Sequence, residues 1–326
     1  VGKSSGNTII TTGVVAVTDT VHRKGIKLMG NQFEFSVVSD DKKWALERIE
    51  DAIAEVQRIE KLLTTFGDYS QTNQINAMAG IEPVKVDLEV FELIERSLRI
   101  SVLTQGAFDI TYGSIDKSLW NFDRAMTSLP DEQTIKSSVR LINFRNVILD
   151  KERHTVFLKE KGMRIGFGGI GKGYAAERVK TLMVQAGVSS GIVNAAGDLT
   201  VWGTQPDGEA WTIGIADPDQ KQRPFASLKL TNTSVATSGN YEKYVVIGGK
   251  KYSHTIDPRS GYPVRGVKSV TIICNNAEIA DAMATPVMVM GITAGINLIN
   301  QLRGIACIVI DDNNTIYTSR NINLTA

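Results

Sequence analysis

A glycine-crowded stretch at residues 163–179, MRIGFGGIGKGYAAERV, places the strongest constraint on how this chain can fold. Glycine permits left-handed backbone angles and lets a ligand approach the main chain closely, and a helix start offers unpaired N–H groups to an anion. We therefore expect a strand, then a phosphate-binding turn, then a helix over residues 173–186. The alternative is a glycine-rich turn that binds no ligand.

Two known phosphate-binding patterns fit this stretch incompletely. The spacing G-x-G-x-x-G that begins at Gly166 is typical of dinucleotide-binding domains, but these place an acidic residue about twenty residues further on. Asp198 comes later than that and follows an Asn-Ala-Ala-Gly turn. A Walker A loop would need Ser or Thr directly after Lys172 to hold Mg²⁺, and this chain has Gly173 there. Both a plain Rossmann domain and a P-loop are disfavoured.

The composition is that of an ordinary globular protein. The chain has 326 residues, of which 42% are hydrophobic, and a formal net charge of +1. This near-neutral charge argues against nucleic acid or an anionic membrane as the main partner. Cys274 and Cys307, the two cysteines, each lie in an apolar run, which favours buried free thiols over a disulfide. We expect no transmembrane span, and residues 1–8 have the composition of a linker.

Runs of short strands alternate with helices, which favours an α+β fold with mainly antiparallel sheet. We expect residues 1–25 to form a tail or peripheral segment and residues 26–326 a single domain. A polar loop is expected at residues 64–80. Apolar residues at helical spacing, with capping residues, predict helices at 42–63, 87–103, 131–138, 173–186, 277–291 and 293–302. Alternating or β-branched runs predict strands at 9–17, 32–38, 146–149, 155–158, 211–215, 226–230, 234–237, 244–247, 267–273 and 305–310, and a strand, a tight turn and a strand within 191–203.

Few residues are placed to carry chemistry. Of the three histidines, His22 and His154 lie in charged segments typical of a solvated surface, whereas His254 precedes a Pro- and Gly-rich turn and is the candidate base. Asp281 and Thr285 lie four apart on a predicted helix, so their oxygens share one face and suit Mg²⁺. A structural histidine and a hydrogen-bonded structural aspartate are the alternatives. Together with the glycine turn, these residues indicate chemistry at a phosphoanhydride.

With these residues in view, the chain resembles the ApbE family of FAD:protein FMN transferases from about residue 27 onward. Any one matching motif could arise by chance, but here they occur in the family's order. The motifs are MG at 29–30, TTFGDYSQTNQIN at 64–76, GAFDIT at 106–111, GGIGKGYAAE at 168–177, VNAAGDL at 193–199, ATSGNYEKY at 236–244, SHTIDPRSG at 253–261 and DAMATPVMVMG at 281–291.

The resemblance implies a T-fold-like α+β fold of two intertwined halves, with helices flanking antiparallel sheets. It implies an enzyme that uses FAD as a substrate and, with Mg²⁺, moves FMN onto a Thr or Ser hydroxyl of an acceptor protein, such as a redox-pump or reductase subunit, releasing AMP. His254 would be catalytic. The family pattern assigns Mg²⁺ to Asp281, Thr285 and the backbone carbonyl of Gly169. It assigns contacts with FAD to Met29, Phe66, Ala107, Phe108, Asp109, Lys172 and Ile256.

This chain departs from the family pattern at a few positions. Gly166 stands where the family usually has an Asp that contacts FAD, and Phe66 stands where Tyr or Trp is usual. Gly171 replaces a common Ala, and Ala196 replaces a common Gly. Two other functions are kept open: a pyrophosphatase, in which water replaces the protein hydroxyl and FAD is split into FMN and AMP, and a non-catalytic FAD-binding protein, which Gly166 would allow. The resemblance also implies an extracytoplasmic location, with a lipid anchor in the precursor.

Overall fold

The computed structural model describes residues 19–115, 128–216, 224–240, 244–320 and 322. The predicted strand at 9–17 lies outside these residues. Every pair of strands that the structure describes is antiparallel, so the predicted α+β fold with antiparallel sheets is confirmed. The strands are β1 (Thr20–Leu28), β2 (Asn31–Ser39), β3 (Val84–Lys85), β4 (Val147–Asp150), β5 (Thr155–Leu158), β6 (Gly191–Ala195), β7 (Asp198–Trp202), β8 (Trp211–Ala216), β9 (Pro224–Leu230), β10 (Thr233–Gly239), β11 (Tyr244–Ile247), β12 (Lys250–Ser253), β13 (Val267–Cys274), β14 (Ile305–Asp311) and β15 (Ile316–Thr318).

An eight-stranded sheet in the order β1-β2-β6-β7-β10-β13-β14-β15 forms the centre of the molecule. Its first hairpin turns at Met29 and Gly30, whose φ angles of 50° and 73° are both positive, as the tight two-residue turn between Leu28 and Asn31 requires. β1 begins at Thr20, so the predicted boundary at residue 25 falls inside a strand of this sheet.

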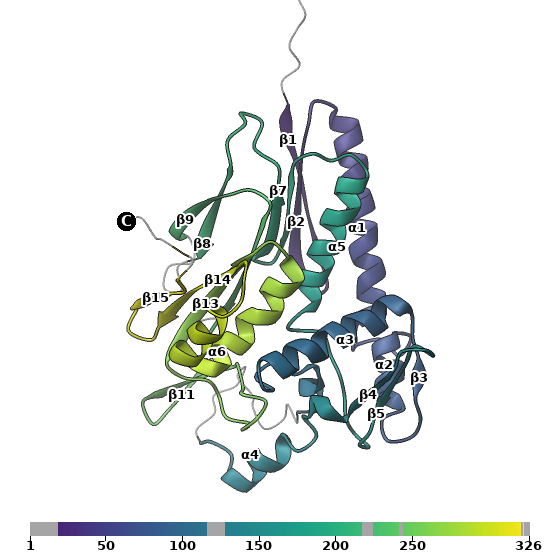
Figure 1. The fold of residues 1–326 in the computed structure, drawn as a ribbon, viewed down its shortest axis with the longest axis vertical. Coiled ribbons are helices and arrows are strands. Elements are labelled where there is room, and N and C mark those ends of the chain that lie inside the picture. Colours follow the sequence, from purple (N-terminus) through teal and green to yellow (C-terminus); the bar gives the residue numbers. More distant parts are fainter. Residues whose placement is uncertain (1–18, 116–127, 217–223, 241–243, 321, 323–326) are drawn as a thin grey trace, which may run out of the picture.

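Three long helices pack on this sheet (Figure 1). α1 lies against β1 and β2, α5 against β6 and β7, and α6 against β10 and β13; α5 also contacts both other helices. The helices are α1 (Lys42–Leu63), α2 (Gln71–Ala77), α3 (Leu88–Leu103), α4 (Glu132–Ser138), α5 (Gly171–Gln185) and α6 (Ala277–Ile299), with 3₁₀ turns η1 (Ile110–Ser114) and η2 (Phe144–Asn146).

α1 shows how the sequence pattern builds the core. Asp41 caps the helix by accepting the N–H of Trp44 at 3.0 Å, and apolar residues at helical spacing then turn toward the sheet. Ile49, Val56 and Ile59 are fully buried there, against Phe33 and other residues of the central core. The predicted helix therefore forms over residues 42–63.

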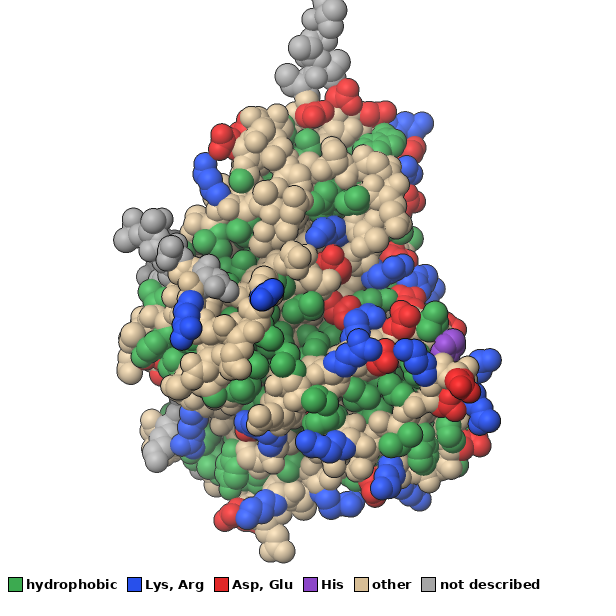
Figure 2. Space-filling model, viewed as in Figure 1, with side chains coloured by type: hydrophobic (Ala, Val, Ile, Leu, Met, Phe, Trp, Pro, Cys, Tyr) green, Lys and Arg blue, Asp and Glu red, His purple; other side chains and the backbone are tan. Residues whose placement is uncertain are grey.

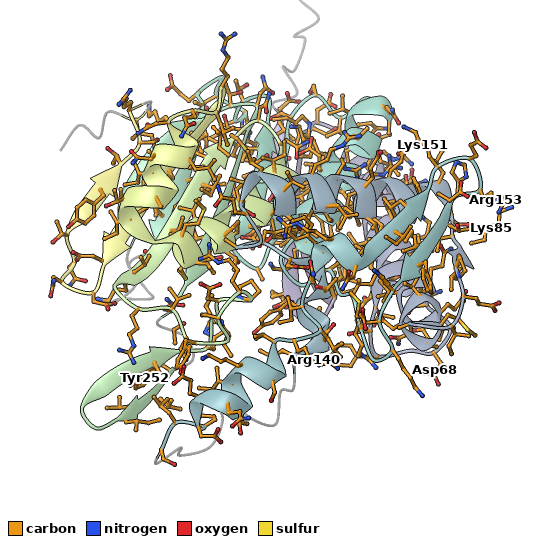
Figure 3. The ribbon with its side chains drawn as sticks, turned by 60° about the horizontal axis from the view of Figure 1, so that its bottom comes forward. Asp68, Lys85, Arg140, Lys151, Arg153 and Tyr252 are labelled. Carbon is orange, nitrogen blue, oxygen red and sulfur yellow. The ribbon has the colours of Figure 1, made fainter. Side chains whose placement is uncertain are left out.

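A smaller lobe holds α2, α3 and the three-stranded sheet β3-β5-β4. The hairpin β11–β12 projects beside α4, as seen in Figure 3, where Tyr252 marks the hairpin and Arg140 lies just past α4. The turn after this hairpin packs against α4, because a Cβ added at Gly261 would lie 2.9 Å from Ile135. Figure 2 shows acidic and basic side chains interspersed over the face that it draws, as expected from the near-neutral charge.

Most predicted elements are confirmed, and two predictions are wrong. The predicted polar loop at 64–80 contains α2, which begins after Ser70, whose hydroxyl oxygen accepts the N–H of Asn73. The predicted strand before the glycine turn does not form, because the side chain of Asn76 bonds both backbone groups of Ile165. The two helices predicted at 277–291 and 293–302 are confirmed as halves of α6, which is interrupted at Gly291 (φ 79°, ψ 176°). Both cysteines are buried free thiols, as expected.

α6 is the one helix among the described residues whose length and composition would suit a membrane span. Half of its most apolar window is nevertheless buried inside the protein, where it packs on β10, β13 and α5. The helix also carries the buried acidic residues Glu278 and Asp281. These features are those of a core helix.

Candidate active site

Residues 163–170, the first part of the glycine stretch, form no strand and are held by contacts with α2 and η1. The backbone N–H of Ile165 donates to Asn76 Oδ1 at 2.7 Å, and Asn76 Nδ2 donates to the carbonyl of Ile165 at 3.1 Å. The N–H of Gly166 donates to the carbonyl of Ile110 at 2.9 Å. These partners satisfy backbone groups that a strand would pair in a ladder, so the strand prediction fails here.

α5 begins directly after these residues, at Gly171, and its first turn is closed by a carboxylate from α6. Asp281 Oδ2 accepts the N–H of Gly173 at 2.8 Å. A Cβ at Gly173 would lie 2.2 Å from the carbonyl oxygen of Ala277 and 2.5 Å from Asp281 Cβ. Only glycine fits this contact between the two helices, which explains why the Ser or Thr of a Walker A loop has no place in this fold.

A buried charged cluster lies at this start of α5, formed by Lys172, Asp198 and Asp281. Lys172 Nζ is 2.6 Å from Asp198 Oδ2 and 3.7 Å from Asp281 Oδ1. Both aspartates are 6% exposed. Burial acts to lower the pKa of Lys172, but the two carboxylates outweigh it and raise this pKa above its usual value. Burial, followed by repulsion from Asp281, raises the pKa of Asp198 to about 6.

Hydroxyl groups border the cluster. Thr285, one turn after Asp281 on α6, has its Oγ1 2.9 Å from Ser238 Oγ on β10. Asp198 Oδ1 accepts the N–H of Thr237, which also lies on β10. Carboxylate and hydroxyl oxygens thus converge from α6, β7 and β10 on the first turn of α5.

The chemistry of this cluster fits a hard cation. Two buried carboxylates face one ammonium group, which leaves a negative charge in excess, and the remaining donors are oxygens of the kind that Mg²⁺ prefers. Among the described residues no group of three or more His, Cys, Asp and Glu side chains could hold a metal. A cation here would therefore depend on hydroxyl, backbone or phosphate oxygens as well, in keeping with the predicted set of Gly169, Asp281 and Thr285.

Several residues expected to contact FAD surround the same turn. Met29 Cε lies 3.5 Å from where a Cβ of Gly171 would be, and the ring of Phe108 lies 3.5 Å from the same position of Gly169. Phe66 is 99% exposed. Its neighbour Thr65 lies 3.6 Å from the place of a Cβ at Gly166, so the loop that carries Phe66 borders the glycine stretch.

Other predicted contacts have side chains engaged inside the protein. Asp109 accepts the N–H and the hydroxyl of Thr111 and the N–H of Phe144, and burial raises the pKa of this carboxyl despite these bonds. Ala107 is 2% exposed. Ile256 is buried in a small cluster with Ile135.

His254 is partly buried, directly after β12. Its neighbour Ser253 donates a short hydrogen bond to Asn240 Oδ1, and Asn240 Nδ2 donates to the carbonyl of Val267 at 2.8 Å. Asn240 follows β10 two residues after Ser238, the partner of Thr285. This path of contacts ties the segment of His254 to the same end of β10 as the charged cluster. The other two histidines are also partly buried and lie elsewhere, where His22 bonds Ser39 and His154 packs on Phe91.

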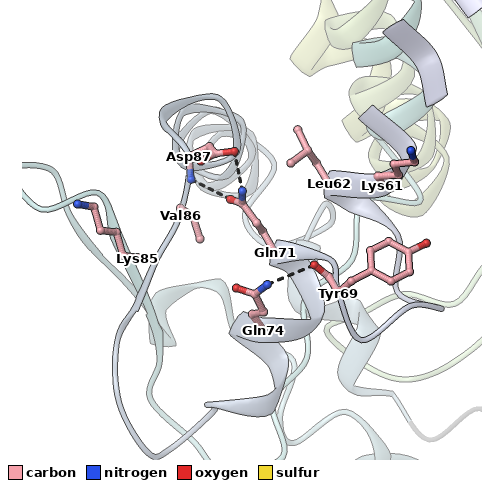
Figure 4. Close-up of a pocket in the computed structure, with 8 residues that line it drawn as sticks. All are labelled: Lys61, Leu62, Tyr69, Gln71, Gln74, Lys85, Val86 and Asp87. Atoms are coloured by element: carbon pink, nitrogen blue, oxygen red, sulfur yellow. Dashed lines mark hydrogen bonds between the residues drawn. The ribbon is translucent and has the colours of Figure 1, made fainter. Parts of the chain in front are cut away.

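A surface pocket of about 490 Å³ lies apart from this cluster, between the end of α1, the start of α2 and the loop before α3 (Figure 4). Within it Gln71 Nε2 donates to Asp87 Oδ2 at 2.6 Å, and Gln74 donates to the carbonyl of Tyr69. The pocket contains none of the predicted site residues. We therefore assign it no role in the chemistry.

Some residues that contact the cluster or the segments beside it were not predicted from the sequence. Asp198 was considered only as the acidic residue of a dinucleotide-binding domain, and Ser238, Asn240 and Glu177 were given no role. Their positions within the matching motifs were the available signal. What the sequence alone could not supply was the pairing of β7 with β10 and of α5 with α6.

Comparisons with known proteins show the family to which the chain is related. The model of the ApbE family matches residues 29–309. A Klebsiella pneumoniae (strain 342) protein named FAD:protein FMN transferase is 34% identical over 294 residues, which cover 90% of this chain and 90% of that protein. A Treponema pallidum (strain Nichols) protein of the same name is 31% identical over 291 residues, covering 84% of this chain and 80% of its own.

Solved structures show the same fold. The crystal structure of the ApbE protein from Thermotoga maritima has a TM-score of 0.82 and 29% sequence identity, and the match covers 92% of this chain and 97% of that one. The flavinyl transferase ApbE from Pseudomonas stutzeri has a TM-score of 0.81 and 26% identity, covering 93% and 96%. Family model, relatives and fold agree over nearly the whole length, and the chain belongs to the ApbE family.

Proposed function

We propose that this chain is a FAD:protein FMN transferase, which moves FMN from FAD onto a hydroxyl group of a target protein and releases AMP. The observation that carries the proposal is the buried cluster of Lys172, Asp198 and Asp281 at the first turn of α5. Relatives that match 80% or more of this chain bear the same functional name, and the cluster is suited to a pyrophosphate with its cation.

The cation in this proposal is Mg²⁺, held by Asp281, Thr285 and the carbonyl of Gly169. Its support is the excess of carboxylate charge over ammonium charge and the hard oxygen donors of α6. Bound there, Mg²⁺ would supply positive charge beside the pyrophosphate, where negative charge builds on the departing AMP.

The side chains of this chain would bind and orient the dinucleotide. Lys172 and the positive end of α5 offer positive charge to phosphate oxygens. The exposed ring of Phe66 offers a stacking surface for the flavin, and Met29 and Phe108 line the glycine turn with apolar atoms. Excluding water from this side of the turn would favour a protein hydroxyl as the acceptor.

His254 would act as the general base. In the proposed step it takes the proton of a Thr or Ser hydroxyl as that oxygen forms a bond to the phosphorus of the FMN half. The bond between this phosphorus and the bridging oxygen breaks, and AMP leaves with that oxygen. A general base of this kind contributes about 10²- to 10⁴-fold in rate.

The test is to incubate the protein with FAD, Mg²⁺ and an acceptor domain that carries a Thr-containing flavinylation motif, and to measure the acceptor's intact mass and the AMP released. We expect one FMN added per acceptor with an equal amount of AMP. His254→Gln should lose both signals, whereas His154→Gln, at a surface turn, should keep them. AMP with free FMN and an unmodified acceptor would indicate a pyrophosphatase instead. FAD that binds and stays intact would indicate a binding protein.

For location, we propose that the protein acts outside the cytoplasm and that its precursor carries a lipid anchor, as the family resemblance implies. Fractionation of cells that express the precursor, with an antibody against the chain, tests this. Membrane-bound protein that protease reaches from the extracytoplasmic side is expected, and protein found in the cytoplasmic fraction would contradict it.

A further inference from the structure

α5 and α6 cap each other. While Asp281 of α6 accepts the N–H of Gly173 in the first turn of α5, Glu177 of α5 accepts the N–H of Ala277, the first residue of α6, through Oε2 at 2.7 Å. In each helix the two participants are four residues apart, so they lie on one face. Each helix therefore supplies a carboxylate to the positive end of the other.

The first turns of α5 and α6 are in close contact. The backbones touch at Gly173, where a Cβ would lie 2.2 Å from the carbonyl oxygen of Ala277. The other side of α6 is held by α3, where Arg96 bonds both carboxylate oxygens of Glu278 at 2.6 and 3.1 Å. The first turn of α6 is thus fixed from two directions, and Asp281 lies one turn further along the same helix.

We infer that Glu177 is a positioning residue for the cation site: by holding the N–H of Ala277, it sets where Asp281 stands relative to Lys172 and the first turn of α5. Glu177 itself does not meet the ligand in this inference. Glu177 also forms an ion pair within α5, because Lys180 Nζ lies 3.6 Å from Glu177 Oε1. The inference rests on the proposed function, because it assumes that Asp281 binds a divalent cation.

Two neutral variants of similar size separate the hydrogen bond from the charge and the packing. Glu177→Gln keeps an oxygen that can accept from Ala277, whereas Glu177→Leu has none and leaves that N–H without its partner. Lys180→Ala removes the ion pair within α5 but leaves the contact with Ala277 intact. Mn²⁺ serves as the probe, because its unbound fraction is measured directly by electron paramagnetic resonance, without any turnover.

We expect Glu177→Leu to weaken Mn²⁺ binding by about 10- to 100-fold, the range typical when a partner that orients a metal ligand is removed. Glu177→Gln and Lys180→Ala should stay within about threefold of the wild type. Circular dichroism and thermal unfolding of the metal-free proteins verify that each variant is folded. If Glu177→Leu does not fold, Glu177→Ala takes its place under the same criteria.

Wild-type affinity in the Leu variant would overturn the inference, as would a Gln variant as weak as the Leu variant, since charge rather than the hydrogen bond would then matter. Either result leaves the proposed transferase standing, because the wild type still binds the ion and transfers FMN. A wild-type protein that binds no Mn²⁺ would overturn the cation site itself, and the inference with it.

Discussion

At the scale of single residues, two glycines in the first turn of α5 differ in whether a side chain would fit at their position. Gly173 is required, because any Cβ would collide with the backbone of α6. Gly171 is not, since the nearest atoms to its Cβ position are 3.4 and 3.5 Å away, which is ordinary contact. An Ala at position 171, which is common in the family, is therefore compatible with the fold of this chain.

This contrast gives a matched pair of substitutions. Gly173→Ala should destabilise the protein by about 1–3 kcal/mol, because overpacking forces α5 and α6 apart. Gly171→Ala should leave stability unchanged or raise it by up to about 1 kcal/mol. Urea unfolding measures both. Equal changes in the free energy of unfolding would contradict the close contact between α5 and α6 at Gly173.

Ala196 is strained in a way that the family's usual glycine would relieve. It occupies the β6–β7 turn with φ 57°, a left-handed conformation. We expect Ala196→Gly to stabilise the protein by about 1 kcal/mol. Ala186→Gly is the control, because that exposed residue ends α5 with φ −79° and should lose stability instead. A loss of stability at position 196 would contradict the assigned turn.

Gly166 has room for the carboxylate that the family usually carries. The nearest atom to its Cβ position is Thr65 Cγ2 at 3.6 Å, and its φ is not positive. We expect Gly166→Asp to tighten FAD binding severalfold, about 1 kcal/mol for one added hydrogen bond, as measured by quenching of flavin fluorescence. Gly166→Ala, which adds a Cβ without the carboxylate, should bind FAD like the wild type. Weaker binding in the Asp variant would mean that this chain holds FAD differently.

At the scale of elements, the sequence predicted what local chemistry determines. α1, α3 and α4 begin after aspartates and carry apolar faces, and their bounds were predicted to within a residue or so. α2 was missed because it is short and polar. Its stability comes from tertiary contacts, such as the bond from Thr72 to the carbonyl of Leu63, which no local pattern reveals. The failed strand has the same cause, since its partner is a side chain of α2.

Asn76 of α2 should therefore contribute more to the free energy of unfolding than a surface residue does. Asn76→Ala removes both hydrogen bonds to Ile165, and we expect a loss of about 1–3 kcal/mol in the free energy of unfolding. Gln74→Ala, an exposed change on the same short helix, should cost less than about 0.5 kcal/mol. Urea unfolding of the two variants decides whether α2 holds the glycine stretch. Equal losses would mean that it does not.

At the scale of the whole molecule, the site exists only after the chain has folded. Lys172, Asp198 and Asp281 come from α5, β7 and α6. Physical reading of the sequence identified the acid and hydroxyl of α6 and the glycine turn separately. It could not show that β7 and β10 pair, or that α6 lies against α5, because nothing local encodes those contacts. The ordered motifs of the family supplied that connection.

The most direct test of the whole account is the rate of FMN transfer by Asp281→Ala at saturating FAD and Mg²⁺. Asp281 both caps α5 and faces Lys172, so its loss should reduce transfer by at least about a hundredfold. Asp51→Ala, on α1 where the exposed Asp51 pairs with Arg48, controls for removing a carboxylate elsewhere and should retain most of the rate. Transfer by Asp281→Ala at the wild-type rate would contradict the assignment of the catalytic site to the start of α5.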